Sequence, residues 1–134
     1  MDRLAPNVLR VVVMNVGGFP LDAQESKNKA VFNFIKEHKV DVIGFTECNV
    51  HWKGIPTADR LEERTRGWFE ALHMSTAYFK KWGEGEVTPK EQYGGVSLWS
   101  INKAAHRVTS RGEDPLGLGH WMWMRYQGRG VTLR

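Results

Sequence analysis

The sequence predicts a mixed α/β fold made of one domain, and three observations support that class. The chain has 134 residues, of which 41% are apolar and 25% charged, the size and composition of one ordinary globular domain. A nearly unbroken apolar, β-branched run at 9–16 is followed within 40 residues by a helical pattern and a second apolar run. From Thr76 onward the pattern changes to short β segments. We therefore expect a parallel βαβ unit followed by hairpins.

The first half of the chain contains the βαβ unit. Segment 9–16 (LRVVVMNV) predicts a strand buried on both faces, as in a parallel sheet, and Gly17-Gly18 ends it. A capping-box pattern at 22–25 and apolar residues at helical spacing predict a helix from about Ala23 to His38. Segment 40–45 (VDVIGF) predicts the second buried strand. Such crossovers are overwhelmingly right-handed and join parallel strands.

The sequence of the second half of the chain predicts one more helix and several short strands. Leu61, Trp68 and Leu72 share a face in a predicted helix over roughly Ala58 to His73. Gln127-Gly128-Arg129-Gly130 is typical of a turn. The predicted β segments are Thr76–Trp82, Gly95–Ile101, His106–Ser110, Trp121–Tyr126 and, after that turn, Val131–Leu133.

The chain shows no internal repeat or low-complexity tract, so we expect a single unit. It lacks a signal-peptide pattern and an apolar stretch long enough to span a membrane, which predicts an intracellular, soluble protein without a membrane partner. Cys48 is the single cysteine and cannot form an intramolecular disulfide or a cysteine-rich zinc site.

The net charge of +4 is concentrated at the C-terminal end. Residues 1–102 carry equal numbers of basic and acidic side chains, whereas residues 103–134 carry six Lys or Arg against two Asp or Glu. Lys and Arg attract phosphate, so this segment indicates nucleic acid as a partner. A solvated basic face is the alternative interpretation.

Two polar residues close the two predicted parallel strands. Asn15 ends the first strand and Glu47 ends the second. Because ligands collect beyond the carboxyl ends of parallel strands, we expect an amide and a carboxylate at one edge of the sheet. Mg²⁺ typically takes one or two protein carboxylates and fills its shell with water and substrate phosphate. A polar residue that only caps a strand or faces solvent is the alternative.

Other motifs are less specific. Gly17-Gly18 lacks the dinucleotide and P-loop patterns, which favours a tight turn over a phosphate cradle or a small nucleotide-binding domain. Cys48 and His51 have a C-x-x-H spacing but no further zinc ligands, and neighbours in sequence are not a catalytic triad. Trp121 and Trp123 share one face of a regular strand. Their rings could stack on bases, but we expect them to pack against a second sheet or a helix. The remaining histidines are scattered: His38, His73, His106 and His120.

Four segments resemble those of a known superfamily. Met14-Asn15-Val16-Gly17-Gly18 is similar to a W-N-x-x-G-like strand end, and 41–47 (DVIGFTE) to a D-I-x-x-x-Q-E-like strand end. Segment 93–100 (YGGVSLWS) resembles a G-G-V-A-I-L strand, and 119–125 (GHWMWMR) resembles segments of retroelement-linked members. The chain thus resembles the N-terminal half of the endonuclease/exonuclease/phosphatase superfamily, which includes pancreatic deoxyribonuclease, apurinic endonucleases and the endonucleases of LINE-type retrotransposons.

This resemblance implies a partial four-layered α-β-β-α sandwich of the DNase I type over residues 1–134. It implies Mg²⁺-dependent hydrolysis of phosphodiesters, with DNA as the expected substrate and Mn²⁺ as a possible substitute metal. Asn15 and Glu47 occupy the positions of the catalytic and metal-site residues. The sequence departs from the family pattern at Met14, Thr46 and Cys48, where Trp, Gln and Thr or Ser are common.

The family's later catalytic groups have no counterpart in these residues. No D-x-N follows Glu47, because the later aspartates, Asp59 and Asp114, are followed two positions on by leucine. We expect a truncated domain that is inactive alone, whose partner is a complementary C-terminal half or the reverse transcriptase region of a longer protein. The alternative is a non-catalytic module that binds nucleic acid or another protein.

Overall fold

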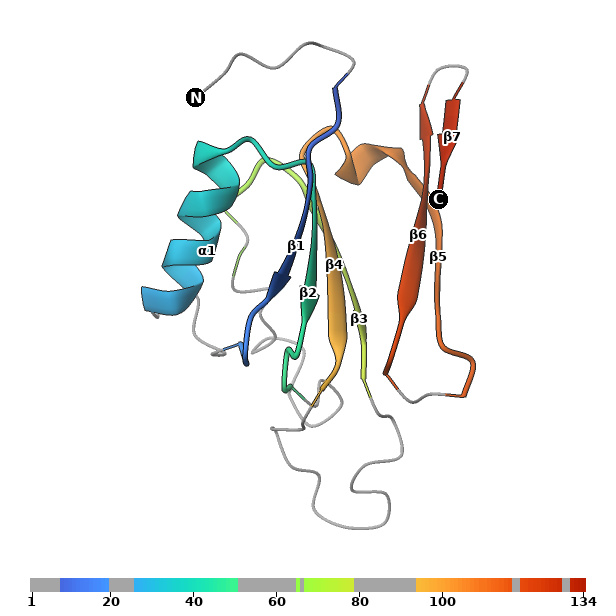
Figure 1. Ribbon diagram of the computed structural model, residues 1–134. Helices are drawn as coiled ribbons and strands as arrows, with labels where there is room; N and C mark the ends of the chain where they lie inside the picture. The colour runs from blue at the N-terminus through green and yellow to red at the C-terminus, as the bar shows by residue number, and fades with distance from the viewer. Residues whose placement is uncertain are drawn as a thin grey trace.

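A computed structural model describes residues 8–19, 26–50, 65, 67–78, 94–116, 119–128 and 131–134. In these residues the chain forms two β-sheets, one α-helix and a short 3₁₀ helix, a mixed α/β structure as expected (Figure 1). The elements are β1 (Val11–Asn15), α1 (Ser26–Glu37), β2 (Val42–Thr46), β3 (Leu72–Ala77), β4 (Val96–Ile101), η3 (Ala105–Arg107), β5 (Val108–Glu113), β6 (Met122–Gly128) and β7 (Val131–Leu133).

The first sheet has the strand order β1-β2-β4-β3, and the second has the order β5-β6-β7. Strands β1 and β2 are parallel, with Val11 opposite Val42 and Asn15 opposite Thr46, which confirms the predicted βαβ unit. All other pairs are antiparallel. Strands β6 and β7 pair as a hairpin, in which Gln127 and Gly128 of the predicted turn still belong to β6, and Arg129 and Gly130 lie outside the described residues.

Helix α1 covers one face of the first sheet, and the main core lies between them (Figure 1). Trp99 on β4 is fully buried and stands at its centre. Its indole contacts the rings of Phe45 (centroids 4.7 Å apart), Phe19 (5.5 Å) and Phe32 (6.1 Å). Aromatic rings at these separations stabilise a core beyond the apolar area they bury.

The second sheet packs against the other face of the first sheet, along β3 and β4. Polar contacts join the two sheets. Ser100 Oγ and Tyr126 Oη lie 2.6 Å apart, and Arg111 Nη1 donates to Ser75 Oγ at 2.7 Å. Met124, which is buried, accepts a hydrogen bond from Ser100. The described residues therefore form three layers in the order helix, sheet, sheet.

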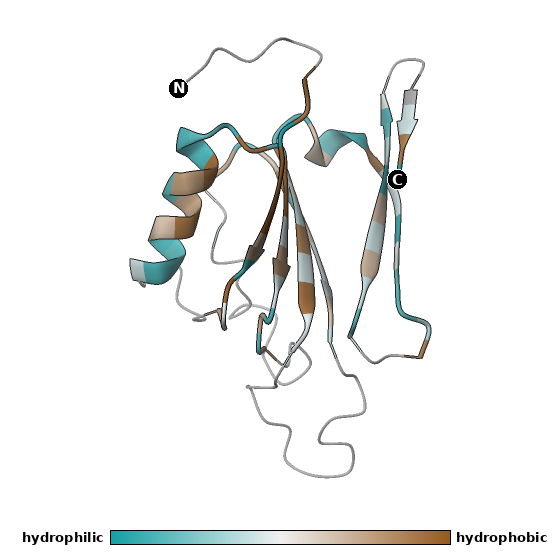
Figure 2. Ribbon diagram, in the orientation of Figure 1, coloured by the Kyte–Doolittle hydropathy of each residue, from teal (hydrophilic) through white to brown (hydrophobic). Residues whose placement is uncertain are grey.

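Strand β1 is apolar from Val11 to Met14, as the sequence indicated (Figure 2), but it is not buried on both faces. Val12 and Met14 pack against the helix-side core, whereas Val11 and Val13 are 58% and 75% exposed. The prediction of a doubly buried strand was therefore wrong. The physical reason is that β1 is an edge strand of its sheet, while the second sheet contacts β3 and β4.

The predicted helix over Ala58 to His73 was wrong in the part that the structure describes. Residues 67–70 form a turn and an isolated bridge, and β3 already begins at Leu72. Gly67 has a φ of +95°, a left-handed conformation that does not continue an α-helix. Trp68 packs from this turn onto Phe32 of α1, with ring centroids 4.9 Å apart. Residues 58–64 lie outside the described residues.

The boundaries of the remaining elements differ by a few residues from the predictions. The predicted helix start, including Asp22 and Glu25, lies outside the described residues, and α1 ends at Glu37, close to the expected end. The third predicted strand begins four residues earlier, at Leu72, because the preceding helix is absent there. Among the described helices, none is long and apolar enough to cross a membrane.

Candidate metal and phosphate site

Asn15 and Glu47 lie at the same edge of the first sheet, as the sequence predicted. Asn15 is the last residue of β1, and Glu47 follows the last residue of β2, to which Asn15 is paired. Both residues are exposed. The parallel register therefore places both residues at the carboxyl edge of two neighbouring strands, with Asn15 opposite Thr46, the residue before Glu47.

The pairing of the two chain segments continues beyond the strands. The backbone N–H of Val16 donates to Thr46 O at 3.1 Å, that of Gly18 to Glu47 O at 2.7 Å, and that of Phe19 to Cys48 O at 2.9 Å. The Asn15 side chain itself accepts a hydrogen bond from Gly17 N at 3.1 Å. These bonds fix the position of the Asn15 amide relative to the Glu47 backbone.

Left-handed backbone occurs at this edge, as it also does at Lys39 and Asn102 at the other end of the sheet. Glu47 has a φ of +52° and Asn49 a φ of +56°, left-handed values that non-glycine residues rarely adopt. Asn tolerates this conformation better than Glu does, because its short polar side chain bonds to the local backbone. Strained backbone persists where the surrounding structure holds it, and it is concentrated at functional sites. The conformation of Glu47 thus supports a role beyond closing the strand.

A third segment, Gly94-Gly95, borders the same edge. The Cys48 N–H donates to Gly95 O (3.3 Å), the Asn49 N–H donates to Gly94 O (2.8 Å), and Asn49 Oδ1 accepts from Gly94 N (2.9 Å). Gly95 has a φ of +85°, and a Cβ there would lie 3.3 Å from Ala77 O. Gly94 and Gly95 therefore allow their backbone to lie close to that of Cys48 and Asn49, the residues that follow Glu47.

Lys27 is a residue of this edge that the sequence analysis missed. Its Nζ donates to Gly18 O at 2.7 Å and lies 3.4 Å from Gly17 O. Lys27 belongs to the first turn of α1, so the helix reaches the loop that follows Asn15. No motif marks this lysine, because its place depends on how α1 lies on the sheet.

The donor atoms at this edge are suitable for Mg²⁺. Glu47 supplies an exposed carboxylate, for which the described part of the chain offers no hydrogen-bond or ion-pair partner, and Asn15 supplies an amide oxygen. Magnesium binds few protein oxygens and keeps several waters, so this small set is compatible with it. Within the described ranges there is no cluster of three or more His, Cys, Asp or Glu side chains suited to a metal.

Cys48 does not have the properties of a nucleophile. It is 1% exposed, and burial raises the pKa of its thiol to about 12. A thiol of that pKa stays protonated at neutral pH, and the thiolate is the reactive form. His51, the other half of the C-x-x-H pattern, lies outside the described residues.

The prediction that Trp121 and Trp123 pack against a second sheet or a helix was wrong for the described residues. Trp121 is 50% exposed and Trp123 is partly exposed. The residues of β6 that contact the first sheet are Met124 and Tyr126, which alternate with the tryptophans. The side of β6 that faces the first sheet carries Met124 and Tyr126. The tryptophans lie on the other side and are therefore not buried between the sheets.

Comparison of the chain with models of known protein families gives no match, and comparison with curated proteins also gives none.

Proposed function

We propose that these residues form the metal-binding half of a Mg²⁺-dependent phosphodiesterase of the endonuclease/exonuclease/phosphatase type, with DNA as substrate. The proposal includes the four-layered α-β-β-α sandwich of that superfamily. The observation that carries it is the position of Asn15 and Glu47 at the carboxyl ends of two neighbouring parallel strands, where the backbone of Glu47 is left-handed.

In this proposal each residue of the edge has a distinct task. The Glu47 carboxylate would hold Mg²⁺ or Mn²⁺, and the Asn15 amide would orient the substrate phosphate. When bound, the cation neutralises negative charge that develops on the phosphate oxygens during displacement. Lys27 keeps the Gly17-Gly18 loop in place through its bond to the Gly18 carbonyl.

Hydrolysis also requires a group that activates water, and the superfamily's D-x-N and Asp-His motifs have no counterpart in these 134 residues. Residues that act as a unit lose almost all activity when one member is absent. We therefore assign metal binding to this chain and expect no cleavage of DNA by it alone.

Calorimetric titration with MgCl₂ and MnCl₂ tests the metal site. We expect the parent chain to bind one divalent ion, and Glu47→Gln to weaken that binding by about tenfold or more, because loss of even supporting groups around a metal costs about 10–100-fold. The control is Glu37→Gln, which removes an exposed carboxylate at the far end of α1 and leaves binding unchanged. Equal binding by the parent and Glu47→Gln would refute the site.

A plasmid assay tests the catalytic part of the proposal. Supercoiled plasmid incubated with Mg²⁺ and the chain should stay intact. In a longer protein that supplies the missing groups, Glu47→Ala should abolish Mg²⁺-dependent cleavage. Cleavage by that variant at the parental rate would show that Glu47 has no part in the reaction.

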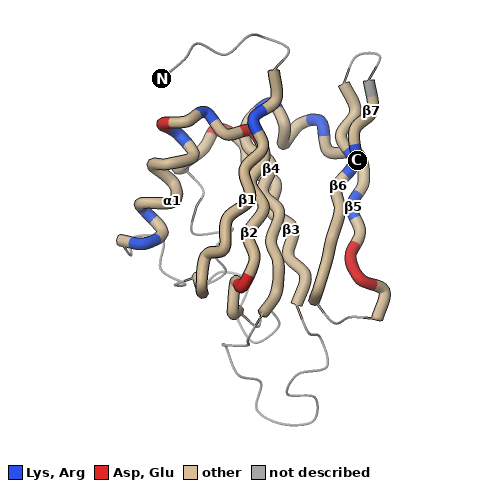
Figure 3. The backbone as a smooth tube through the Cα atoms, in the orientation of Figure 1, with Lys and Arg blue, Asp and Glu red and all other residues tan. Residues whose placement is uncertain are grey.

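Nucleic-acid binding without hydrolysis is a second candidate function. It is favoured by the excess of Lys and Arg at 103–134, a segment that contains η3 and the whole second sheet (Figure 3). Neutralisation of phosphates by such side chains supplies sequence-independent affinity.

A further inference from the structure

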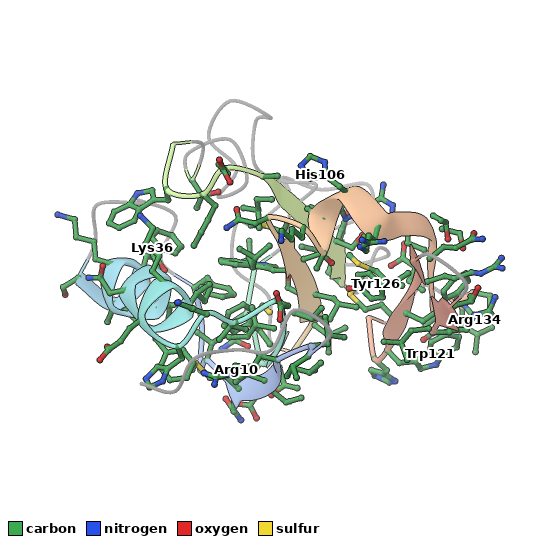
Figure 4. The ribbon with its side chains drawn as sticks, turned by 90° about the horizontal axis from the view of Figure 1, so that it is seen from above. Arg10, Lys36, His106, Trp121, Tyr126 and Arg134 are labelled. Atoms are coloured by element: carbon green, nitrogen blue, oxygen red, sulfur yellow. The ribbon has the colours of Figure 1, made fainter. Side chains whose placement is uncertain are left out.

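The second sheet has an outer face that points away from the first sheet. Met124 and Tyr126 contact Ser100 across the sheets, so the residues that alternate with them on β6 point outward. Figure 4 shows Tyr126 on the side of the second sheet that faces the first, and Arg134 on the opposite side. We call this surface the outer face; its members are Ser110, Trp121, Trp123, Arg125, Gln127 and Arg134.

On the outer face, the Trp123 ring lies between Gly112 on one neighbouring strand and the Arg134 side chain on the other. The Trp123 ring lies across Gly112 of β5, so closely that a Cβ on Gly112 would be 2.6 Å from Nε1. On the β7 side, the guanidinium of Arg134 lies 4.6 Å from the centroid of the same ring. Arginine stacked on an indole in this way is a cation–π contact. It presents a flat, positively charged surface to the solvent, because Arg134 is exposed.

The outer face carries two arginines, Arg125 and Arg134, at the end of the sheet away from Asp114. The register that pairs Tyr126 with Leu133 brings Arg125 opposite Arg134 at the next position. Like charges directly opposite each other destabilise a sheet. The acidic residues of the described second sheet lie toward the other end of β6. Glu113 alternates with Arg111 toward the first sheet, and Asp114, which is buried, lies opposite Trp121, to whose carbonyl its N–H donates at 3.1 Å. This pair of cations is therefore suited to a bound anion.

Exposed aromatic rings beside the two arginines identify the kind of anion. Trp121 is half exposed and lies just before β6, two residues before Trp123; the bond from Asp114 N–H to its carbonyl continues the strand pairing to it. Bases of a single strand can stack on tryptophan rings and on guanidinium planes, whereas the bases of a duplex are already stacked on each other. Phosphates of the same strand are the natural partners of arginine. Charge and aromatic surface together fit a single-stranded nucleic acid better than a duplex.

We propose that the outer face binds single-stranded nucleic acid, with Arg125 and Arg134 contacting phosphates and Trp121 stacking on a base. This inference rests on the second candidate function, in which the outer face stays uncovered, and not on the four-layered sandwich, whose last helical layer would cover that face. Asn15 and Glu47 belong to the other sheet, so the strand would be held on a surface separate from the proposed metal edge.

Fluorescence anisotropy with labelled oligonucleotides of about 12 nucleotides, a length within the usual site sizes, tests the proposal. The titrations use oligo-dT, oligo-rU and a duplex, in EDTA so that no cleavage takes place. We expect both single strands to bind more tightly than the duplex. The ratio of the affinities for oligo-dT and oligo-rU shows whether DNA or RNA is preferred.

Two variants separate the phosphate contacts from the stacking contact. The plot of log affinity against log salt has a negative slope, to which each single-strand phosphate contact contributes about 0.7. Arg125→Gln/Arg134→Gln should therefore make that slope less steep by about 1.4. Trp121→Ala should weaken binding by about tenfold at constant slope. The matched control, Lys36→Gln/Lys39→Gln, removes the same charge at exposed positions on α1 and the turn after it, and should leave the slope unchanged.

Circular dichroism establishes that the variants are folded, and Arg134→Gln alone serves as a milder variant if the double one is not. Equal loss of binding in the arginine and lysine variants would overturn the proposal in favour of net charge alone. Duplex binding as tight as single-strand binding would also overturn it. If the parent chain binds no nucleic acid, both this inference and the second candidate function fail, while the metal titration is unaffected.

Discussion

At the scale of single residues, position 112 must be a glycine because the Trp123 ring on the neighbouring strand lies over it. A Cβ at this position would lie 2.6–2.8 Å from three atoms of the Trp123 ring, so Gly112→Ala must displace the indole. We expect the variant to lose about 1–3 kcal/mol of unfolding free energy, the usual cost of overpacking. Urea denaturation followed by circular dichroism measures it.

The control for this substitution is Gly44→Ala on β2. A Cβ there would meet Leu98 Cδ1 at 3.8 Å, an ordinary contact. Its unfolding free energy should change by less than about 1 kcal/mol. Equal losses in the two variants would mean that Gly112 is not specifically required by the indole.

His73 makes stability depend on pH. Burial, and then the charge of Arg111, lower the pKa of His73 below its ordinary value of 6.5. Its Nδ1 is buried, and no described residue forms a hydrogen bond with it. Because the folded state favours the neutral imidazole, the contribution of His73 to stability is complete above pH 6.5 and is lost as the pH falls from 6.5 toward the lower folded pKa.

We therefore expect the unfolding free energy to fall between about pH 7.5 and about pH 5, and to fall less in His73→Gln. Urea denaturation at the two pH values measures the difference. The same pH dependence in both proteins would show that other groups are responsible.

At the scale of elements, the core between α1 and the first sheet depends on one side chain of β4. Trp99 is fully buried against three phenylalanine rings. Trp99→Ala should cost about 3–5 kcal/mol of unfolding free energy, the typical loss for a buried aromatic side chain. Trp121→Ala, which truncates a half-exposed tryptophan, should cost less than about 1 kcal/mol. Similar melting temperatures for the two variants would contradict this assignment of the core.

The βαβ unit could be predicted from the sequence because its signals are local. Runs of β-branched residues, helical spacing and short connections are sufficient to place β1, α1 and β2. The second helix could not be predicted correctly, because the spacing of apolar residues such as Trp68 indicates which side chains are buried but not whether the backbone that carries them is helical. Trp68 reaches Phe32 of α1 from a turn, and the helical pattern has no bearing on that contact.

The same reasoning explains which parts of the candidate site were predictable. Asn15 and Glu47 could be placed together because parallel strands end at one edge. The contact of Lys27 with Gly18 depends on the position of a helix over the sheet, which no local pattern specifies. The exposure of Val13 and Trp121 depends on which strands the second sheet covers, a property of the tertiary structure alone.

At the scale of the whole molecule, the two sheets are joined by a small number of polar contacts. Tyr126→Phe removes the hydroxyl that lies 2.6 Å from the buried Ser100 Oγ. We expect a loss of about 1 kcal/mol of unfolding free energy, the typical net value of one hydrogen bond. Thr109→Val removes an exposed hydroxyl from the same sheet and should change stability by less than about 0.5 kcal/mol. Denaturant titrations of the two variants decide between a specific inter-sheet contact and a general effect of lost hydroxyls.

Strand β1 is attached to its surroundings at both ends. At the start, Arg10 N donates to Asp41 Oδ2 (2.8 Å) and Arg10 Nη1 donates to His38 O (2.8 Å), while the bonds that follow Asn15 hold the other end. Between these two attachments, side chains alternate between the faces of the sheet. Deleting one residue between Arg10 and Asn15, with the pairing at Arg10 kept, would place Val16 where Asn15 now stands. Replacing the exposed Val11 or Val13 would leave the amide in position. The number of residues between Arg10 and Gly17, more than their identity, is thus what determines where the amide lies relative to Glu47.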